Sequence, residues 1–412
     1  MRIVKLRDIS DLKTGPFGTQ FSASEYVSNG IPVINVKNIG YGSISAAGLD
    51  YVGENTLERL SEHKLKAGDI VFGRKGSVDR HCLICREQEG WMQGSDCIRV
   101  RFIDDSVYPE FVSYFLLTNA VKIKINNSAV GSTMASLNTG ILGDIDITLP
   151  EYTEQKRIAL ILGEIDKKIS KNNMVNDYLE EMAKTIYNYW FVQFDFPDKN
   201  GNPYKSSGGK MQNISDFGIA PSDWKTGNLY DIANFINGLA CQKYRPNENE
   251  SSLPVIKIRE MHEGISVDSE RVKADLPQNN IVNTGDILFS WSASLEVQRW
   301  AGTTGGLNQH IFKVIPNDGY TSSYVYHQLK AYVVKFIQMA EARKTTMGHI
   351  TSDHLKQSVI VLPPENVIQK FSNSVDMIHA EISCINMENQ KLCQIRDWLL
   401  PMLMNGQTTI ED

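Results

Sequence analysis

The histidine and cysteines near position 81 are the residues of this chain best suited by type to hold a metal ion. They form the run His81-Cys-Leu-Ile-Cys85, with Cys97 a short distance further on. Thiolates and imidazoles are the ligands that zinc prefers, but a structural zinc site needs four of them. A lone Cys-x-x-Cys pair is weak evidence, and the second half of the chain, where His310 aligns with Cys97, has no matching cysteines. We therefore expect idle or buried thiols and no metal site.

Motifs that would indicate catalysis are missing from the sequence. It contains no G-x-x-x-x-G-K-[ST] phosphate loop, no G-x-S-x-G elbow and no H-E-x-x-H pair. Asn202-Pro-Tyr204 is similar to the Asn-Pro-Pro-aromatic signature of adenine methyltransferases, but one proline is missing and no glycine-rich cofactor motif precedes it. The sequence therefore predicts a protein that is not an enzyme and that holds no cofactor of its own.

Basic, amide and hydroxyl side chains flank the turns of two similar regions, and their chemistry suits DNA. Arg and Lys can pair with guanine edges and Asn or Gln with adenine edges, whereas Ser, Thr and Lys suit phosphates. The candidates in the first region are Lys13, Lys37, Arg74, Lys75, Ser77 and Arg80. The candidates in the second region are Gln242, Lys243, Arg259, Ser290, Trp291, Ser292, Asn308, Gln309, His310, Lys344 and Thr345. A solvated surface side chain is the simpler interpretation of each residue alone, but the clustering favours DNA binding.

The composition sets limits on the class of protein. A chain of 412 residues with 42% apolar and 22% charged residues is long enough for two or three globular domains. No apolar run is long enough for a membrane span, and six cysteines indicate a reducing cytoplasm rather than a disulfide scaffold. The net charge of −6 argues against a uniformly basic surface but permits a local basic groove.

Two long helices are predicted to carry these regions. Over residues 158–190, apolar residues recur at alternating steps of four and three, which is the spacing of a coiled-coil seam. The same spacing recurs over residues 371–399, where Arg396 is the one break. Pro150 and Pro363 precede the two helices, at a position where proline is tolerated.

The globular region before each helix is repeated as well. Gly68-Asp-Ile-Val-Phe72 is echoed by Gly285-Asp-Ile-Leu-Phe289, and Ile31-Pro-Val-Ile34 by Leu253-Pro-Val-Ile256. Short β-rich runs separated by turn residues predict two mixed, mainly β domains with few helices. The sequence offset between the repeats drifts inside the domains and is constant along the helices, so loop lengths differ while the helix geometry is held. The chain is a tandem duplication of a domain followed by a helix.

These patterns predict an α+β fold of two tandem domains, each followed by a long helix, with the helices paired as an antiparallel coiled coil with pseudo-twofold symmetry. The expected segments are 1–150 for the first domain, 151–194 for the first helix, 195–221 for a linker rich in Gly, Pro, Asn and Ser, 222–363 for the second domain, 364–406 for the second helix and 407–412 for a tail.

Three asparagines, Asn172, Asn176 and Asn389, occupy seam positions where apolar residues are expected. A buried polar seam residue lowers stability but fixes the register of a coiled coil; alternatively, the helices splay and the seam is wet there. Antiparallel pairing is expected to bring Asn172 close to Asn389. Parallel pairing would instead align Asn176 with Asn389.

Several motifs of the helices and the linker carry a family resemblance. They are Glu154-Gln155-Lys-Arg-Ile158, the helix exit Asn188-Tyr-Trp-Phe191, the linker 196–209 and the ending Trp398-Leu-Leu-Pro-Met402. Together with Gly15-Pro-Phe-Gly18, Gly68-Asp-Ile and Asn308-Gln-His-Ile-Phe312 in the domains, they are similar to the specificity subunits of type I restriction–modification systems. The resemblance spans nearly the whole chain. It departs at Pro364-Glu-Asn-Val-Ile-Gln369, where the second helix lacks the Glu-Gln pair of the first.

The resemblance implies a non-catalytic subunit in which two target recognition domains each read one half of a split, asymmetric site in double-stranded DNA. It implies that the helices set the spacer and dock two modification subunits, which bring S-adenosylmethionine, and that restriction (translocase) subunits join in the full complex. Two alternatives stay open: a self-contained DNA-modifying enzyme with its own recognition domains, and a coiled-coil scaffold that binds only proteins.

Overall fold

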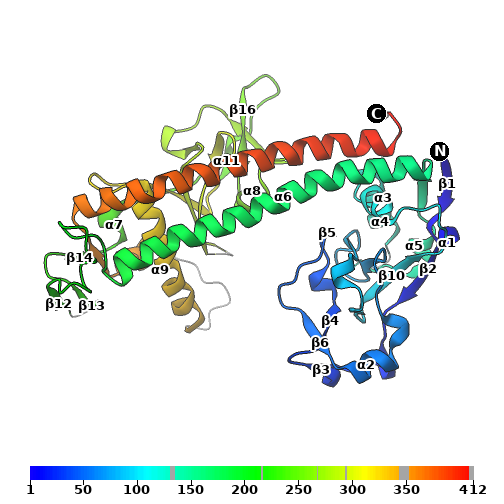
Figure 1. The fold of residues 1–412 in the computed structure, drawn as a ribbon. Coiled ribbons are helices and arrows are strands. Elements are labelled where there is room, and N and C mark those ends of the chain that lie inside the picture. The colour runs from blue at the N-terminus through cyan, green and yellow to red at the C-terminus, as the bar shows by residue number, and fades with distance from the viewer. Residues whose placement is uncertain (130–134, 215–216, 267, 293–294, 343–351, 408–412) are drawn as a thin grey trace. The chain divides into compact units, whose positions relative to one another are not determined.

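The computed structural model (Figure 1) describes residues 1–129, 135–214, 217–266, 268–292, 295–342 and 352–407. The chain divides into two compact units, one made of Met1–Lys168 and Cys393–Asp412 and the other of Ile169–Leu392. Each of the two long helices therefore contributes to both units. Within the described ranges, no helix combines the length and the apolar character that crossing a membrane requires.

The described residues of the first unit form three sheets. The largest has the strand order β2-β10-β7-β8-β5, the second β3-β6-β4-β9, and the third pairs β1 with β11. The strands are β1 (Arg2–Lys5), β2 (Ser10–Thr14), β3 (Tyr26–Val27), β4 (Ile31–Ile34), β5 (Tyr41–Gly42), β6 (Asp50–Val52), β7 (Ile70–Gly73), β8 (His81–Leu83), β9 (Met92–Gln93), β10 (Cys97–Phe102) and β11 (Asp146–Leu149). Every residue of β7 is buried, as its uninterrupted apolar sequence requires of a central strand.

Short helices pack against these sheets and precede the first long helix. They are α1 (Leu6–Ile9), α2 (Glu54–Arg59), α3 (Pro109–Leu116), α4 (Asn119–Ser128) and α5 (Thr139–Gly143), and α6 (Tyr152–Tyr187) follows. Phe111 and Leu116 of α3 share one apolar core with Ile158 and Leu162 of α6. The core of the first domain therefore includes the start of the helix that follows it.

The second unit repeats this arrangement. Its main sheet has the order β15-β22-β19-β20, and a second has the order β17-β16-β21-β18. The strands are β12 (Met211–Ile214), β13 (Gly218–Pro221), β14 (Lys225–Gly227), β15 (Ala233–Asn237), β16 (Ser252–Ile256), β17 (Arg271–Lys273), β18 (Ile281–Val282), β19 (Ile287–Ser290), β20 (Glu296–Arg299), β21 (Gly305–Leu307), β22 (Ile311–Pro316) and β23 (Ile360–Leu362). The helices are α7 (Leu229–Ile232), α8 (Ile258–Glu263), α9 (Ser322–Ala342), α10 (Ser352–Lys356) and α11 (Glu365–Met404).

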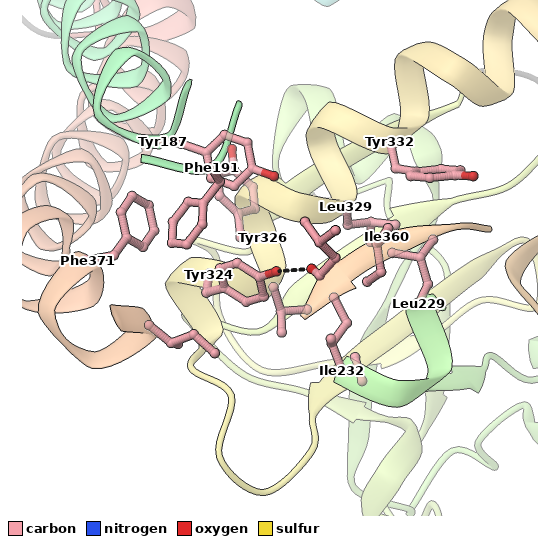
Figure 2. Packing of buried hydrophobic residues seen from close by; sticks show 14 of the residues in the cluster. Tyr187, Phe191, Leu229, Ile232, Tyr324, Tyr326, Leu329, Tyr332, Ile360 and Phe371 are labelled. Atoms are coloured by element: carbon pink, nitrogen blue, oxygen red, sulfur yellow. Dashed lines mark hydrogen bonds between the residues drawn. The ribbon is translucent and has the colours of Figure 1, made fainter. Parts of the chain in front are cut away.

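Aromatic rings from both long helices fill the core of the second unit. Figure 2 shows Tyr187 and Phe191 beside Phe371 of α11 and Tyr324 of α9. The Phe191 ring lies 5.0 Å from that of Tyr324 and 5.0 Å from that of Phe371, both edge to face. Aromatic pairs of this geometry contribute beyond the area they bury. The end of α6 and the start of α11 are therefore fixed in one core.

The two domains share their topology as well as their sequence motifs. In both, the four-stranded sheet that holds the Ile-Pro-Val-Ile or Leu-Pro-Val-Ile strand has one parallel pairing: β4 with β9, and β16 with β21. Gly15 and Gly238 occupy equivalent places, since Gly15 N donates to Cys97 O and Gly238 N to Ile311 O. The sequence alignment of Cys97 with His310 is therefore wrong by one position, because these backbone bonds pair Cys97 with Ile311.

The two long helices lie side by side within each unit. In the second unit, Asn172 Nδ2 donates to Asn389 Oδ1 (2.8 Å) and Asn176 Nδ2 donates to Asn386 Oδ1 (2.7 Å). Rising numbers on α6 thus meet falling numbers on α11, so the helices run in opposite directions along this stretch. In the first unit the contact continues, with Arg396 Nη1 3.0 Å from Asp166 Oδ1.

The segment between α6 and the second domain is more ordered than a turn-rich linker suggests. It contains the hairpin β12–β13, and Phe196 stacks between Tyr204 (4.7 Å) and Trp224 (5.2 Å). The chain leaves α6 through a π-helical turn, Asn188–Val192. Phe194 then adopts a left-handed backbone (φ 63°), a strained conformation for this residue type. The stacking of Phe196 between Tyr204 and Trp224 stabilises this turn, which leads from α6 into the second domain.

Candidate nucleic-acid interface

Loops at one end of each main sheet present most of the candidate residues. In the first domain the loop after β7 begins at Arg74, whose N–H donates to Asp96 O (2.8 Å). In the second domain the loop after β19 begins at Trp291, whose N–H donates to His310 O (3.3 Å). Residues 74 and 291 are therefore equivalent positions on one framework, beside the equivalent positions 96 and 310.

Glycines bring a third loop against these two. A Cβ on Gly15 would lie 1.9 Å from Gly94 O, and a Cβ on Gly238 would lie 2.0 Å from Asn308 O. No side chain tolerates such a distance, so both positions require glycine for the close approach of two backbones. The repeated glycines explain how each domain gathers loops that are far apart in the sequence.

Three of the basic candidates in the first domain are bound to carboxylates of the same domain. Lys13 is paired with Glu62, Lys37 Nζ lies 2.8 Å from Asp50 Oδ2, and Lys75 Nζ lies 3.2 Å from Asp96 Oδ1. The same partnerships lower the pKa of the Glu62 and Asp50 carboxyl groups, mainly through hydrogen bonds from Lys13 and Lys37. A phosphate would have to compete with these carboxylates for each lysine.

The two arginines of the same loop are placed differently. The Arg74 guanidinium carbon lies 6.0 Å from the ring centre of Phe17, and that of Arg80 lies 5.4 Å from the ring centre of Tyr41. Ser77, between them, is exposed. A cation over a ring is attracted to it without being neutralised, so these arginines keep their charge available.

In the second domain, the loop after β19 presents an aromatic surface. The Trp291 ring lies 5.8 Å from that of His310 and 6.0 Å from that of Phe312. His310 is exposed, and Gln309 and Ser292 are half-buried. At the two equivalent positions, the first domain therefore presents Arg74 and Asp96, and the second presents Trp291 and His310.

Two candidates of the second domain lie inside it rather than on its surface. Ser290 is fully buried and its hydroxyl donates to Ser292 O (3.2 Å). Asn308 is also buried, its Oδ1 accepts from His310 N (3.3 Å), and its Nδ2 donates to Gln309 Oε1 (3.1 Å). Both side chains therefore stabilise the conformation of their own loops through hydrogen bonds within them.

Three of the remaining candidates lie on short helical turns of the second domain. Gln242 and Lys243 are exposed on the 3-10 turn Cys241–Tyr244. Arg259 on α8 is exposed but bound to the buried Glu260, 2.7 Å away. Lys344 and Thr345 lie outside the described residues.

The histidine and cysteines considered for zinc occupy apolar surroundings. Cys82 and Cys97 are fully buried, and burial raises the pKa of Cys97 to about 12. His81 Nε2 lies 3.0 Å from Ser113 Oγ, and burial lowers the pKa of His81 to about 3. Across the part of the chain that the structure describes, no three His, Cys, Asp or Glu residues form a group that could hold a metal ion.

Sequence reasoning missed two exposed aromatic residues and one lysine at this surface. Phe17 and Tyr41 are 58% and 48% exposed, and both rings lie under cations. Their only sequence signal is that each stands in a glycine-flanked turn, Gly15-Pro-Phe-Gly18 and Gly40-Tyr-Gly42. The lysine is Lys122 on α4, whose Nζ lies 4.4 Å from the centre of the Tyr41 ring. No local sequence pattern distinguishes it from other helical surface lysines.

The fold and these loops define a class of protein: two similar recognition domains on a shared pair of helices, with different side chains on equivalent loops. The chain matches the family described as type I restriction modification DNA specificity domain over residues 1–181 and 221–396, and it belongs to that family. The two matches coincide with the two repeats. The resemblance to specificity subunits is thereby confirmed, and with it the expectation of a recognition component rather than an enzyme.

Relatives across the full length support the same assignment. The chain is 22% identical to the type I restriction enzyme MjaIX specificity subunit of Methanocaldococcus jannaschii, over 100% of this chain and 94% of the relative. It is also 22% identical to the HindI specificity subunit of Haemophilus influenzae, over 85% and 89%. A crystal structure of the type I restriction–modification S subunit from M. genitalium has the same fold, with a TM-score of 0.55, 15% identity, and 98% and 95% of the two chains covered.

Proposed function

We propose that each domain reads one half of a split, asymmetric site in double-stranded DNA. The observation that carries this proposal is the difference between residues at equivalent loop positions: Arg74 with Asp96 in the first domain, and Trp291 with His310 in the second. A guanidinium donates hydrogen bonds to a guanine edge, whereas an indole ring makes apolar contacts. Two readers with different chemistry require two different half-sites.

The helices act as the spacer between the half-sites, as an antiparallel coiled coil with pseudo-twofold symmetry. The opposite running directions and the Asn172–Asn389 hydrogen bond support this pairing. Asn172 is buried, so its pairing with another amide fixes one register at the cost of some stability. The 36 residues of α6 span about 54 Å at 1.5 Å per residue, which exceeds one turn of DNA, ~34 Å.

The outer face of the helices docks two modification subunits. Four apolar residues of α6 form an exposed stripe at helical spacing: Met174, Val175, Tyr178 and Met182, with Tyr178 70% exposed. Exposed apolar stripes of this kind mark protein interfaces. In this proposal S-adenosylmethionine binds to the modification subunits, restriction subunits complete the assembly, and the complex acts in the cytoplasm.

Methylome sequencing of cells that express this chain with its modification subunit tests the proposal. The expected result is one methylated motif with two unlike halves and a fixed spacer. Replacing residues 1–150 by the equivalent domain of a relative is expected to change one half and spare the other. A change in both halves, or a symmetric motif, would contradict the assignment of one domain to each half-site.

Two further measurements separate the alternative functions. Methyl transfer by the purified chain alone would indicate a self-contained enzyme. A lack of salt-sensitive DNA binding, even with the partner subunits present, would indicate a protein scaffold. At the residue level, Gln309→Ala is expected to lose roughly 1–3 kcal/mol of discrimination at one base pair. Lys75→Ala is expected to weaken binding to all sequences alike.

A further inference from the structure

Tyr41 holds two cations that come from separate elements of the first domain. Its ring, on β5, lies 4.4 Å from Lys122 Nζ of α4 and 5.4 Å from the guanidinium carbon of Arg80 in the loop between β7 and β8. The ring itself is about half exposed. Three segments that are distant in the sequence thus place two positive charges on one aromatic side chain at the surface.

These two cations differ from most cations of the same domain in how they are compensated. Lys13, Lys37 and Lys75 each have a carboxylate partner, and so does Lys124, only two residues from Lys122, whose Nζ lies 2.6 Å from Asp146 Oδ2. Within the described residues, neither Arg80 nor Lys122 has a carboxylate oxygen within ion-pair distance. The Tyr41 ring positions both cations, and an external anion can bind them without displacing a carboxylate partner.

The neighbouring charged residues do not neutralise Arg80 and Lys122. Asp79 adjoins the ring, and its Oδ2 accepts a hydrogen bond from Tyr41 Oη (3.3 Å). The pKa of Lys122 is lowered chiefly by burial, with Asp79 and Asp397 acting in the opposite direction and Arg396 in the same one. Lys122 is therefore already partly dehydrated, so an anion that binds it displaces less water than it would from a fully solvated lysine.

We propose that Tyr41 is an aromatic platform that presents Arg80 and Lys122 together to the phosphate backbone of DNA. This inference rests on the proposed function of the first domain as a DNA reader, and it assigns to that domain an anchor that is independent of base sequence. Arg80 offers a planar donor fork and Lys122 a point charge, both of which suit phosphate oxygens. Arg74, in the same loop, is left free for base edges.

The salt dependence of DNA binding tests the two cations. The full chain, assembled with its modification subunits, is titrated with a fluorescent duplex of mixed sequence at several salt concentrations. Each phosphate contact that is removed flattens the slope of log K against log salt by about 0.9. Lys122→Ala and Arg80→Ala are each expected to flatten it by about that amount, whereas Lys124→Ala, on the same helix but ion-paired, is expected to leave it unchanged.

Two substitutions of Tyr41 test the platform itself. Tyr41→Phe keeps the ring and removes only the hydrogen bond to Asp79, so it is expected to bind DNA as the parent does. Tyr41→Leu removes the ring and is expected to weaken binding several-fold, with the methylated motif unchanged. Thermal unfolding of each variant shows whether the domain is intact, and a loss of binding that follows a loss of folding does not count for the proposal.

The outcomes separate this inference from the proposed function. If the parent complex binds DNA with a strong salt dependence while Lys122→Ala, Arg80→Ala and Lys124→Ala share its slope, the anchor is overturned and the reading function stands. If Tyr41→Phe weakens binding as much as Tyr41→Leu does, the ring is not the platform. If the parent complex binds no DNA at all, the proposed function fails first.

Discussion

Arg396 of α11 and Asp166 of α6 form an ion pair in the first unit, with Nη1 and Oδ1 3.0 Å apart. Asp166 also accepts a 2.6 Å hydrogen bond from Tyr114 Oη of α3. Arg396 is a charged residue that breaks the apolar pattern of the second helix. The break thus has a structural cause, because a guanidinium at this place links both long helices to the first domain.

Removal of the carboxylate at this junction is expected to lower the stability of the first unit. Asp166→Ala leaves the half-buried Arg396 without its partner on α6 and Tyr114 without its acceptor. Both groups are partly solvated, so we expect a loss of about 1 kcal/mol in denaturant unfolding. Asp166→Asn keeps an acceptor for Tyr114 and should lose less. Asp397→Ala, which removes an exposed partner of Arg396, is the control; an equal loss there would show that the junction adds nothing.

Cysteine crosslinking is expected to report the running direction of the helices. Cysteines at positions 172 and 389 should form a disulfide more readily than cysteines at 176 and 389, because Asn172 and Asn389 are in direct contact. Cys384 and Cys393 lie on the same helix and should first be replaced by serine. The rate of crosslinking in mild oxidant, followed by gel mobility, gives the comparison. Faster crosslinking of the 176 and 389 pair would support parallel helices.

Buried histidines are expected to make the second unit sensitive to acid. His379 and His327 lie 3.0 Å apart through their Nε2 atoms, and burial lowers their pKa values to about 4 and about 2. Arg299, Asp376, Lys330, Tyr326 and Ser323 face this pair.

In the unfolded chain both histidines have the ordinary pKa near 6.5, so as the pH falls they bind protons at a higher pH than in the folded protein. The free energy of unfolding is therefore at its full value above pH 6.5 and falls as the pH drops toward 4. The slope is up to about 1.4 kcal/mol per pH unit for each histidine. Denaturant midpoints at pH 7 and pH 5 check this. His379→Gln is expected to reduce the difference between them; an unchanged difference would place the acid sensitivity elsewhere, as at His81 of the first unit.

Alanine at the two packed glycines is expected to damage one domain at a time. In Gly15→Ala the new Cβ collides with Gly94 O, and in Gly238→Ala it collides with Asn308 O. Overpacking of this kind costs typically 1–3 kcal/mol. The proposed function further predicts that Gly15→Ala impairs only the half-site read by the first domain. Gly53→Ala is the control, since no atom lies within 4 Å of its added Cβ. Equal damage to both half-sites would argue against independent domains.

Much of the fold follows from patterns that are local or repeated in the sequence. The seam spacing gives both helices, and the repeated glycine-anchored motifs give two domains with one topology. The candidate surface follows less well, because the state of a cation depends on partners that are distant in the sequence. Lys13 meets Glu62 and Lys75 meets Asp96 only after folding, while Tyr41 gathers Arg80 and Lys122 from two other elements. Local composition cannot show which cations will be paired with a carboxylate and which will lie over an aromatic ring.

Each long helix starts in the core of one unit and ends in the core of the other. Ile158 and Leu162 of α6 are buried with the first domain, whereas Ala183 and Tyr187 near its end are buried with the second. Leu403 and Met404 at the end of α11 are in turn buried with the first. A genetic exchange with its boundary near residue 150 therefore places a foreign domain against resident side chains of both long helices. We therefore expect natural recombination to be limited mainly by how well the foreign domain packs against these side chains of α6 and α11. The DNA sequence that the foreign domain recognises should matter less.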